Sequence, residues 1–163
     1  MKKTWVLIAD EAIVRILDWP GHGHGNELQS VEEITDPLAH AKGAELRRDA
    51  EGRRAGGATE GARQGTPHQL RSEANPTASA GEGEQHVEAE SFARRVAGHL
   101  DAARQQGRFD ELHLVAAPRF LGLLRNQLSP AVRDTVVREV DKDFVHFGNA
   151  DITSRLFPPP LKP

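Results

Sequence analysis

The sequence predicts an α/β fold of three layers, in which helices cover both faces of a mixed β-sheet. Short apolar runs rich in β-branched residues, the pattern of buried strands, occur in both halves of the chain. In the second half these runs alternate with helical patterns and so require parallel crossover connections, whereas the first runs follow one another closely enough for antiparallel pairing. The 163 residues suffice for one ordinary domain, so we predict a single domain over residues 1–163.

The N-terminal part is predicted to contain three strands. Residues 4–9 form a nearly continuous apolar run, typical of a strand covered on both faces, and Asp10 and Glu11 then turn the chain. A second apolar run over residues 12–18 follows so soon that an antiparallel hairpin is expected. Residues 28–34 alternate imperfectly and predict a third, more exposed strand. The first half of the sheet is therefore expected to be antiparallel.

Residues 47–86 are predicted to form a long, mobile, Gly/Arg-rich loop. Leu70 is the only large aliphatic or aromatic residue between Arg47 and His86, so the segment cannot bury enough apolar surface to offset its ordering entropy. Its charge is uneven, because six arginines face three acidic residues over 47–71, whereas 72–86 carries three glutamates and no Lys or Arg. The first part of the loop is therefore net basic.

Helices and strands are predicted to alternate in the C-terminal part. Apolar residues from Phe92 to Ala103 recur at steps of four, four and three residues, which indicates one face of a helix that ends near Gly107. Further strands are predicted over residues 112–117 and 136–140. Helical segments are predicted over residues 120–128, from Ser129 onward, and over residues 149–156.

Composition excludes several classes of function. The formal net charge is −3, so any attraction to nucleic acid must come from a local patch. The absence of cysteine removes thiol catalysis, disulfide scaffolds and Cys-ligated metals. No apolar run approaches the length of a membrane span, and the N-terminal run is too short for a signal peptide. We therefore expect a cytoplasmic protein with no membrane partner and no cofactor.

The net-basic part of the loop is the first candidate site. Its glycines could let the backbone approach an RNA phosphate chain while the arginines neutralise the phosphate charge. No aromatic residue interleaves the arginines, so base stacking is not expected there. The alternative is a solvated insertion that binds nothing. The residues predicted to bind RNA are Arg47, Arg48, Arg53, Arg54, Gly56, Gly57, Arg63 and Arg71.

The junction between strand 112–117 and the next helix is the second candidate. A helix N-terminus at the carboxyl end of a sheet strand attracts anions, and Arg119 would reinforce that attraction. Arg125 lies further along the same helix. We predict that Arg119 and Arg125 bind an anion or a partner protein. The alternative is that both arginines are ordinary surface residues.

Two groups of residues resemble metal ligands, and neither is predicted to bind a metal. Asp10, Asp141 and Asp143 follow strands, as in two-metal nucleases, but no spacing forces them onto one site. His22 and His24 could chelate a transition metal, although two histidines on a glycine-rich turn are more often exposed loop residues.

Three stretches together resemble a bacterial family of host attachment proteins, described as required for attachment to host cells. They comprise residues 5–10 with 12–17, residues 109–125 and residues 140–143, and the middle stretch is the most specific. The resemblance covers nearly the whole chain apart from the loop. This family is in turn similar to the central domain of archaeal and eukaryotic peptide-chain release factors, which implies a ribonuclease-H-like or Rossmann-like mixed sheet.

The release-factor resemblance also implies a partner. In those factors a Gly-Gly-Gln tip on a mobile loop enters the ribosomal peptidyl-transferase centre and positions water against the peptidyl-tRNA ester. Here Gly56 and Gly57 are followed by Ala58, and Gln64 lies seven residues beyond Gly57, so the tripeptide is absent. We therefore expect a non-catalytic module that associates with RNA, the ribosome or tRNA. The alternatives are a peptidyl-tRNA hydrolase-like enzyme with Gln64 as its catalytic residue, and a protein-interaction domain with an inert loop.

Overall fold

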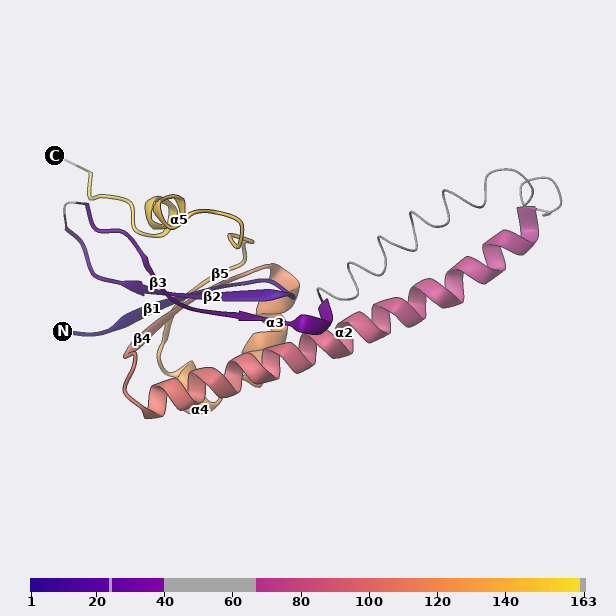
Figure 1. The fold of residues 1–163 in the computed structure, drawn as a ribbon, viewed down its shortest axis with the longest axis horizontal. Coiled ribbons are helices and arrows are strands. Elements are labelled where there is room, and N and C mark those ends of the chain that lie inside the picture. Colours follow the sequence, from indigo (N-terminus) through magenta and orange to yellow (C-terminus); the bar gives the residue numbers. More distant parts are fainter. Residues whose placement is uncertain (24, 40–66, 162–163) are drawn as a thin grey trace. The chain divides into compact units, whose positions relative to one another are not determined.

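The computed structural model describes residues 1–23, 25–39 and 67–161 of the chain, with only the backbone described over 67–82 (Figure 1). Two compact units are distinguished. Residues 1–36 and 90–163 form one of them, which we call the sheet unit, and residues 37–89 form the other. All the side-chain contacts discussed below lie within the sheet unit.

Five strands form one mixed sheet in the order β3-β2-β1-β4-β5. Their bounds are β1 Thr4–Ala9, β2 Ile13–Trp19, β3 Gln29–Thr35, β4 Glu111–Ala116 and β5 Val136–Val140. The β1–β2 and β2–β3 pairs are antiparallel, whereas the β1–β4 and β4–β5 pairs are parallel. The predicted hairpin, the parallel second half and all five predicted strands are confirmed, with bounds shifted by one residue at most.

Among the described residues, the helices with defined bounds are α2 (Pro67–Gln105), α3 (Pro118–Gln127), α4 (Pro130–Arg133) and α5 (Asn149–Leu156). Prolines open α3 and α4 because the first helical position needs no backbone N–H. The Ser129 hydroxyl caps α4 by accepting a hydrogen bond from the Val132 amide at 3.3 Å. Gly107, with φ +70°, follows the C-terminus of α2, where a left-handed residue favours glycine.

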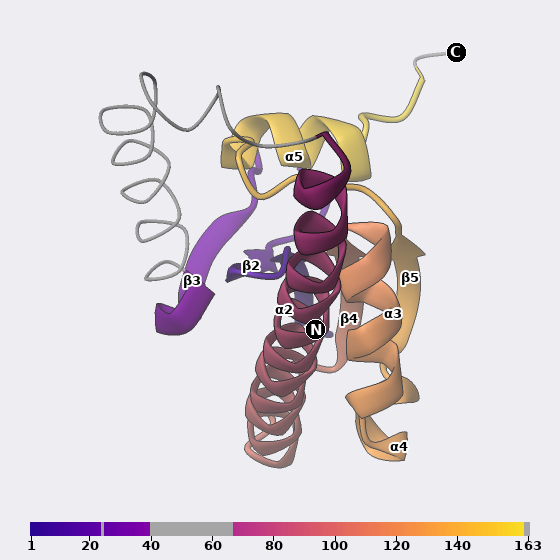
Figure 2. The same cartoon turned by 90° about the vertical axis from the view of Figure 1, so that its right-hand side faces the viewer.

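Helices cover both faces of the sheet, so the predicted three layers are present (Figure 2). One face packs against α3 and the part of α2 that belongs to the sheet unit, and the other packs against α5. Every residue of β1 is buried, as its apolar run predicted, because this strand is central and covered on both sides. The first core includes Leu7, Ile16, Phe92, Phe120 and Leu124, and the second includes Val6, Ile8, Leu17, Ile152 and Leu156.

The prediction of a loop over residues 47–86 is wrong from residue 67 onward, where the chain is already helical in α2. The loop was predicted because the segment has too little apolar surface to form a core. A helix that continues from a packed segment does not need its own core, because each added residue gains a backbone hydrogen bond without a new nucleation cost. Residues 47–66 of the predicted loop lie outside the described part of the chain.

Candidate nucleic-acid interface

Most of the residues predicted to bind RNA lie outside the part of the chain that the structure describes. Arg71 is in α2, and its backbone alone is described. The residues outside the description are Arg47, Arg48, Arg53, Arg54, Gly56, Gly57 and Arg63, together with the catalytic candidate Gln64. The interface must therefore be assessed from the arginines of the sheet unit.

The two predicted anion-binding arginines lie at opposite ends of α3, and each faces a carboxylate. Arg119 lies in the first turn, with its Nε 3.5 Å from Oε1 of Glu11 in the β1–β2 turn. Arg125 lies in the last turn and forms an ion pair with Glu139 of β5, and this interaction raises the pKa of the Arg125 guanidinium. The structure thus does not bring Arg119 and Arg125 together in one anion site.

Two of the three carboxylates considered as metal ligands, Asp10 and Asp143, have local structural partners. Oδ1 of Asp10 accepts hydrogen bonds from the Ala12 and Ile13 amides, both at 2.8 Å, and so stabilises the hairpin turn. Oδ1 of Asp143 accepts a hydrogen bond from the Val145 amide at 3.1 Å. Within the described ranges no cluster of three or more His, Asp or Glu side chains could hold a metal ion. His22 packs edge-on against Trp19, and His24 is not among the described residues.

A positively charged groove beside the edge strand β5 is a feature that sequence reasoning missed. We call it the basic groove. It has a volume of about 630 Å³, and α3, the segments around α4 and β5 all contribute to its walls. Its lining residues are Arg125, Asn126, Leu128, Arg133, Val136, Val137, Arg138 and Glu139.

Two of the three arginines in the basic groove have no acidic partner among the described residues. Arg133 donates from Nη2 to the Arg125 carbonyl at 3.0 Å, and Arg138 donates from Nη1 to the Leu156 carbonyl at 2.8 Å. Only Arg125 is paired, with Glu139. A guanidinium has five N–H donors, so both Arg133 and Arg138 keep donors available for an incoming anion. The groove therefore combines net positive charge with unused hydrogen-bonding capacity.

A bulge in β5 gives the groove its side-chain arrangement. Leu112 of β4 lies opposite Val136, but the next residue, His113, lies opposite Arg138, so Val137 is an extra residue in the ladder. The bulge places Arg138 on the same face of the sheet as His113. The next residue of β5, Glu139, then points to the opposite face, where Arg125 of α3 contacts it. The bulge therefore directs Arg138 toward the Leu156 carbonyl of α5 and leaves Glu139 to form the ion pair with Arg125.

His113 of β4 lies opposite Arg138 in the sheet, and its pKa is affected by that arginine. Burial lowers the pKa of the His113 imidazole below its ordinary value, and the positive charge of Arg138 lowers it further, while Glu111 acts in the opposite direction. Its Nδ1 is buried and has no hydrogen-bond partner within the described structure. His113 is therefore favoured in its neutral form.

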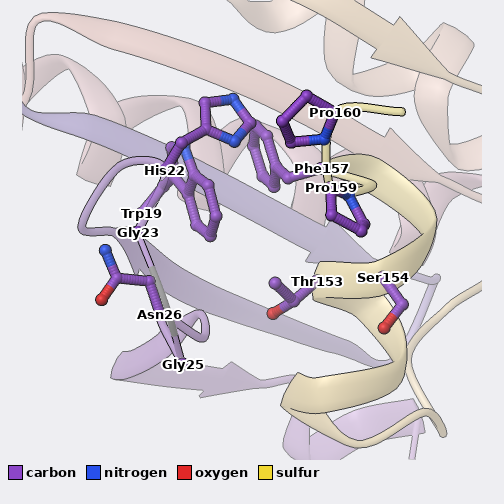
Figure 3. A pocket seen from close by; sticks show the side chains of 10 residues that line it. All are labelled: Trp19, His22, Gly23, Gly25, Asn26, Thr153, Ser154, Phe157, Pro159 and Pro160. Carbon is purple, nitrogen blue, oxygen red and sulfur yellow. The ribbon is translucent and has the colours of Figure 1, made fainter. Parts of the chain in front are cut away.

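A second concave site, the aromatic pocket, lies on the α5 side of the sheet and has a volume of about 510 Å³ (Figure 3). The Trp19 and Phe157 rings stack with 4.1 Å between their centroids and an angle of 7° between their planes. His22 meets both rings edge-on. The pocket is lined by Trp19, His22, Gly23, Gly25, Asn26, Thr153, Ser154, Phe157, Pro159 and Pro160. Sequence reasoning singled out His22 for a metal and missed its aromatic neighbours.

The fold and the basic groove define an α/β protein with a cluster of three arginines at one edge of its sheet. Residues 5–156 match the family described as "Protein required for attachment to host cells", and the chain belongs to this family. The chain is also similar to an uncharacterized protein from Rickettsia prowazekii (strain Madrid E), with 32% identity over 71 residues. That alignment covers 42% of this chain and 47% of the relative, so the match spans about half of the relative's length. Within the described residues, no helix is long and apolar enough to cross a membrane.

Proposed function

We propose that this protein is a non-catalytic module that associates with RNA by contacting its phosphates, in the ribosome or in tRNA. The observation that carries the proposal is the basic groove, where neither Arg133 nor Arg138 has an acidic partner in the part of the chain that the structure describes, and both retain N–H donors. Guanidinium groups match phosphate oxygens in geometry and are weakly hydrated, so they suit this contact better than lysine. Contacts to phosphates position a protein on RNA without reading its sequence.

The arginine-rich segment, residues 47–71, is proposed as the second contact. It belongs to the unit formed by residues 37–89 and is net basic in a chain of net charge −3. Its proposed contact residues are Arg47, Arg48, Arg53, Arg54, Arg63 and Arg71, with Gly56 and Gly57 allowing close backbone approach. The resemblance to the central domain of release factors is the reason to examine the ribosome and tRNA first.

The test is fluorescence anisotropy of a labelled single-stranded RNA titrated with the purified protein. We expect binding that weakens as salt increases, and a large loss of affinity when the six arginines of the arginine-rich segment are changed to glutamine. A matched control shuffles residues 47–71 at fixed composition, which preserves the charge and should retain most of the affinity. Absence of binding at low salt would refute the proposal.

The same shuffled variant separates this proposal from a hydrolase. A peptidyl-tRNA hydrolase that uses Gln64 would need that residue at one position in the segment, so shuffling would abolish turnover of peptidyl-tRNA. Phosphate contact by distributed arginines has no such requirement. If the unmodified protein cleaves peptidyl-tRNA and the shuffled or Gln64→Ala variant does not, the hydrolase replaces the non-catalytic module.

A further inference from the structure

The aromatic pocket carries an inference that does not depend on phosphate contact. We propose that it binds the uncharged base of a nucleoside, or of an unpaired nucleotide, that carries an exocyclic amino group. Of the residues in this chain 28% are charged, yet none of the described residues that line the pocket is Asp, Glu, Lys or Arg. A ligand that enters it therefore gains no ion pair, and a charged group would lose its hydration without compensation. The pocket selects a neutral ligand.

The walls of the pocket select a planar ligand. Trp19 and Phe157 form a parallel ring pair, and His22 stands edge-on to Trp19 with 5.4 Å between the ring centroids. Figure 3 shows Trp19 and His22 on one side of the pocket and the α5 residues Thr153 and Ser154 on the other. Flat aromatic surfaces favour stacked or edge-on contact with another π-system. A heterocyclic base meets these requirements, since each base has a polarisable flat face.

Two side chains in the pocket offer hydrogen-bond acceptors. Asn26 donates from Nδ2 to the Gly21 carbonyl at 2.8 Å, which leaves its Oδ1 as an acceptor. Ser154 donates its hydroxyl proton to the Ala150 carbonyl at 3.0 Å, so its oxygen can only accept from a ligand. These two oxygens therefore favour a ligand that offers hydrogen-bond donors. An exocyclic amino group supplies two such donors, as in adenine, cytosine and guanine.

Thr153 keeps this arrangement in place. Its hydroxyl accepts a hydrogen bond from the Leu28 amide at 2.9 Å and donates to the Asn149 carbonyl at 2.6 Å. It thereby ties the start of β3 to α5, the two sides from which Asn26 and Ser154 approach the pocket. Thr153 is thus a positioning residue.

The test uses the fluorescence of Trp19. The chain has two tryptophans, and Trp5 is 3% exposed and stacked on Phe109, so the Trp5→Phe variant isolates the signal of Trp19. We expect adenosine to quench that signal saturably and independently of salt, and inosine, which has a carbonyl in place of the amino group, to bind at least fivefold more weakly. Calorimetric titration of the unsubstituted protein with adenosine gives the same affinity without relying on the variant.

Substitutions in the pocket complete the test. Trp19→Leu should weaken adenosine binding by about five- to 150-fold, the range found when a stacking aromatic is removed. Ser154→Ala should weaken it severalfold, while Ser91→Ala, at an exposed position of α2, should not. No saturable binding, or equal affinity of the Trp19→Leu variant, would overturn the proposal.

The two sources of the base are distinguished by competition. If adenosine displaces an RNA oligonucleotide with unpaired adenines but not the corresponding duplex, the pocket takes a base from RNA. If adenosine binds and displaces neither, the pocket takes a free nucleoside. Absence of RNA binding by the unsubstituted protein at low salt, with adenosine binding intact, would refute the proposed function alone and leave the pocket standing.

Discussion

Neutralising Arg133 and Arg138 of the basic groove should change the salt dependence of RNA binding by a defined amount. In the Arg133→Gln/Arg138→Gln variant, two proposed phosphate contacts are removed. Each phosphate contact contributes about 0.7 to the slope of log affinity against log salt for single-stranded RNA, so the slope should become shallower by about 1.4. When salt rises from about 50 mM to about 200 mM, the ratio of the RNA affinity of the unsubstituted protein to that of the variant should therefore fall by about sevenfold.

Each of the two arginines makes only a small contribution to the fold. Arg133 and Arg138 each donate one hydrogen bond to a backbone carbonyl, and glutamine retains an N–H donor. The matched control is Arg94→Gln/Arg104→Gln, which removes the same charge from two exposed positions of α2. Anisotropy titrations at several salt concentrations give the slopes, and circular dichroism verifies folding. An unchanged slope, or an equal change in the control, would refute the contact of the basic groove with phosphate.

Three further predictions concern folding, and each is measured by urea denaturation. The pKa of His113 is lower in the folded protein than in the unfolded chain, so the unfolded chain binds a proton first as the pH falls. The unfolding free energy is therefore unaffected by His113 above pH about 6.5 and decreases as the pH falls from there through the lowered pKa. His113→Gln should therefore flatten the decline in unfolding free energy between pH 7 and pH 5, and a parallel decline would contradict the assignment. Phe92→Ala should cost about 3–5 kcal/mol because Phe92 is fully buried between α2 and the sheet, and a loss below about 1 kcal/mol would mean that this helix does not pack there. Gly107→Ala should lower the unfolding free energy by about 1 kcal/mol, because Gly107 has a positive φ. Gly122→Ala in α3 should raise it by up to about 1 kcal/mol, because an added methyl group there meets open space. Equal effects of the two substitutions would argue against a left-handed residue after the end of α2.

The strands could be predicted because their signals are local. The run over residues 4–9 reads as a doubly covered strand from composition alone, and the sheet places it at the centre as β1. The full length of α2 could not be predicted in this way, because the N-terminal part of that helix has no apolar periodicity of its own. Apolar periodicity indicates which face of a helix is buried, and a segment without such periodicity gives no helical signal in the sequence.

The concave sites could not be predicted because they depend on register. The bulge at Val137 decides that Arg138 faces α5 while Glu139 faces Arg125 of α3, and no local sequence pattern predicts this bulge. Trp19 and Phe157 are far apart in sequence and meet across β2 and the end of α5. The sequence did identify Arg119 and Arg125 as arginines flanking one helix, but it could not show that Glu11 and Glu139 already face them.

Co-sedimentation of the purified protein with bacterial ribosomes over a salt series tests the central claim most directly. The account predicts that the protein pellets with ribosomes at low salt, is released as salt increases, and no longer pellets when the arginines of the basic groove and of the arginine-rich segment are neutralised. The Arg94→Gln/Arg104→Gln control should still pellet. Protein that stays in the supernatant at the lowest salt, or that pellets equally with all arginines neutralised, would contradict the account.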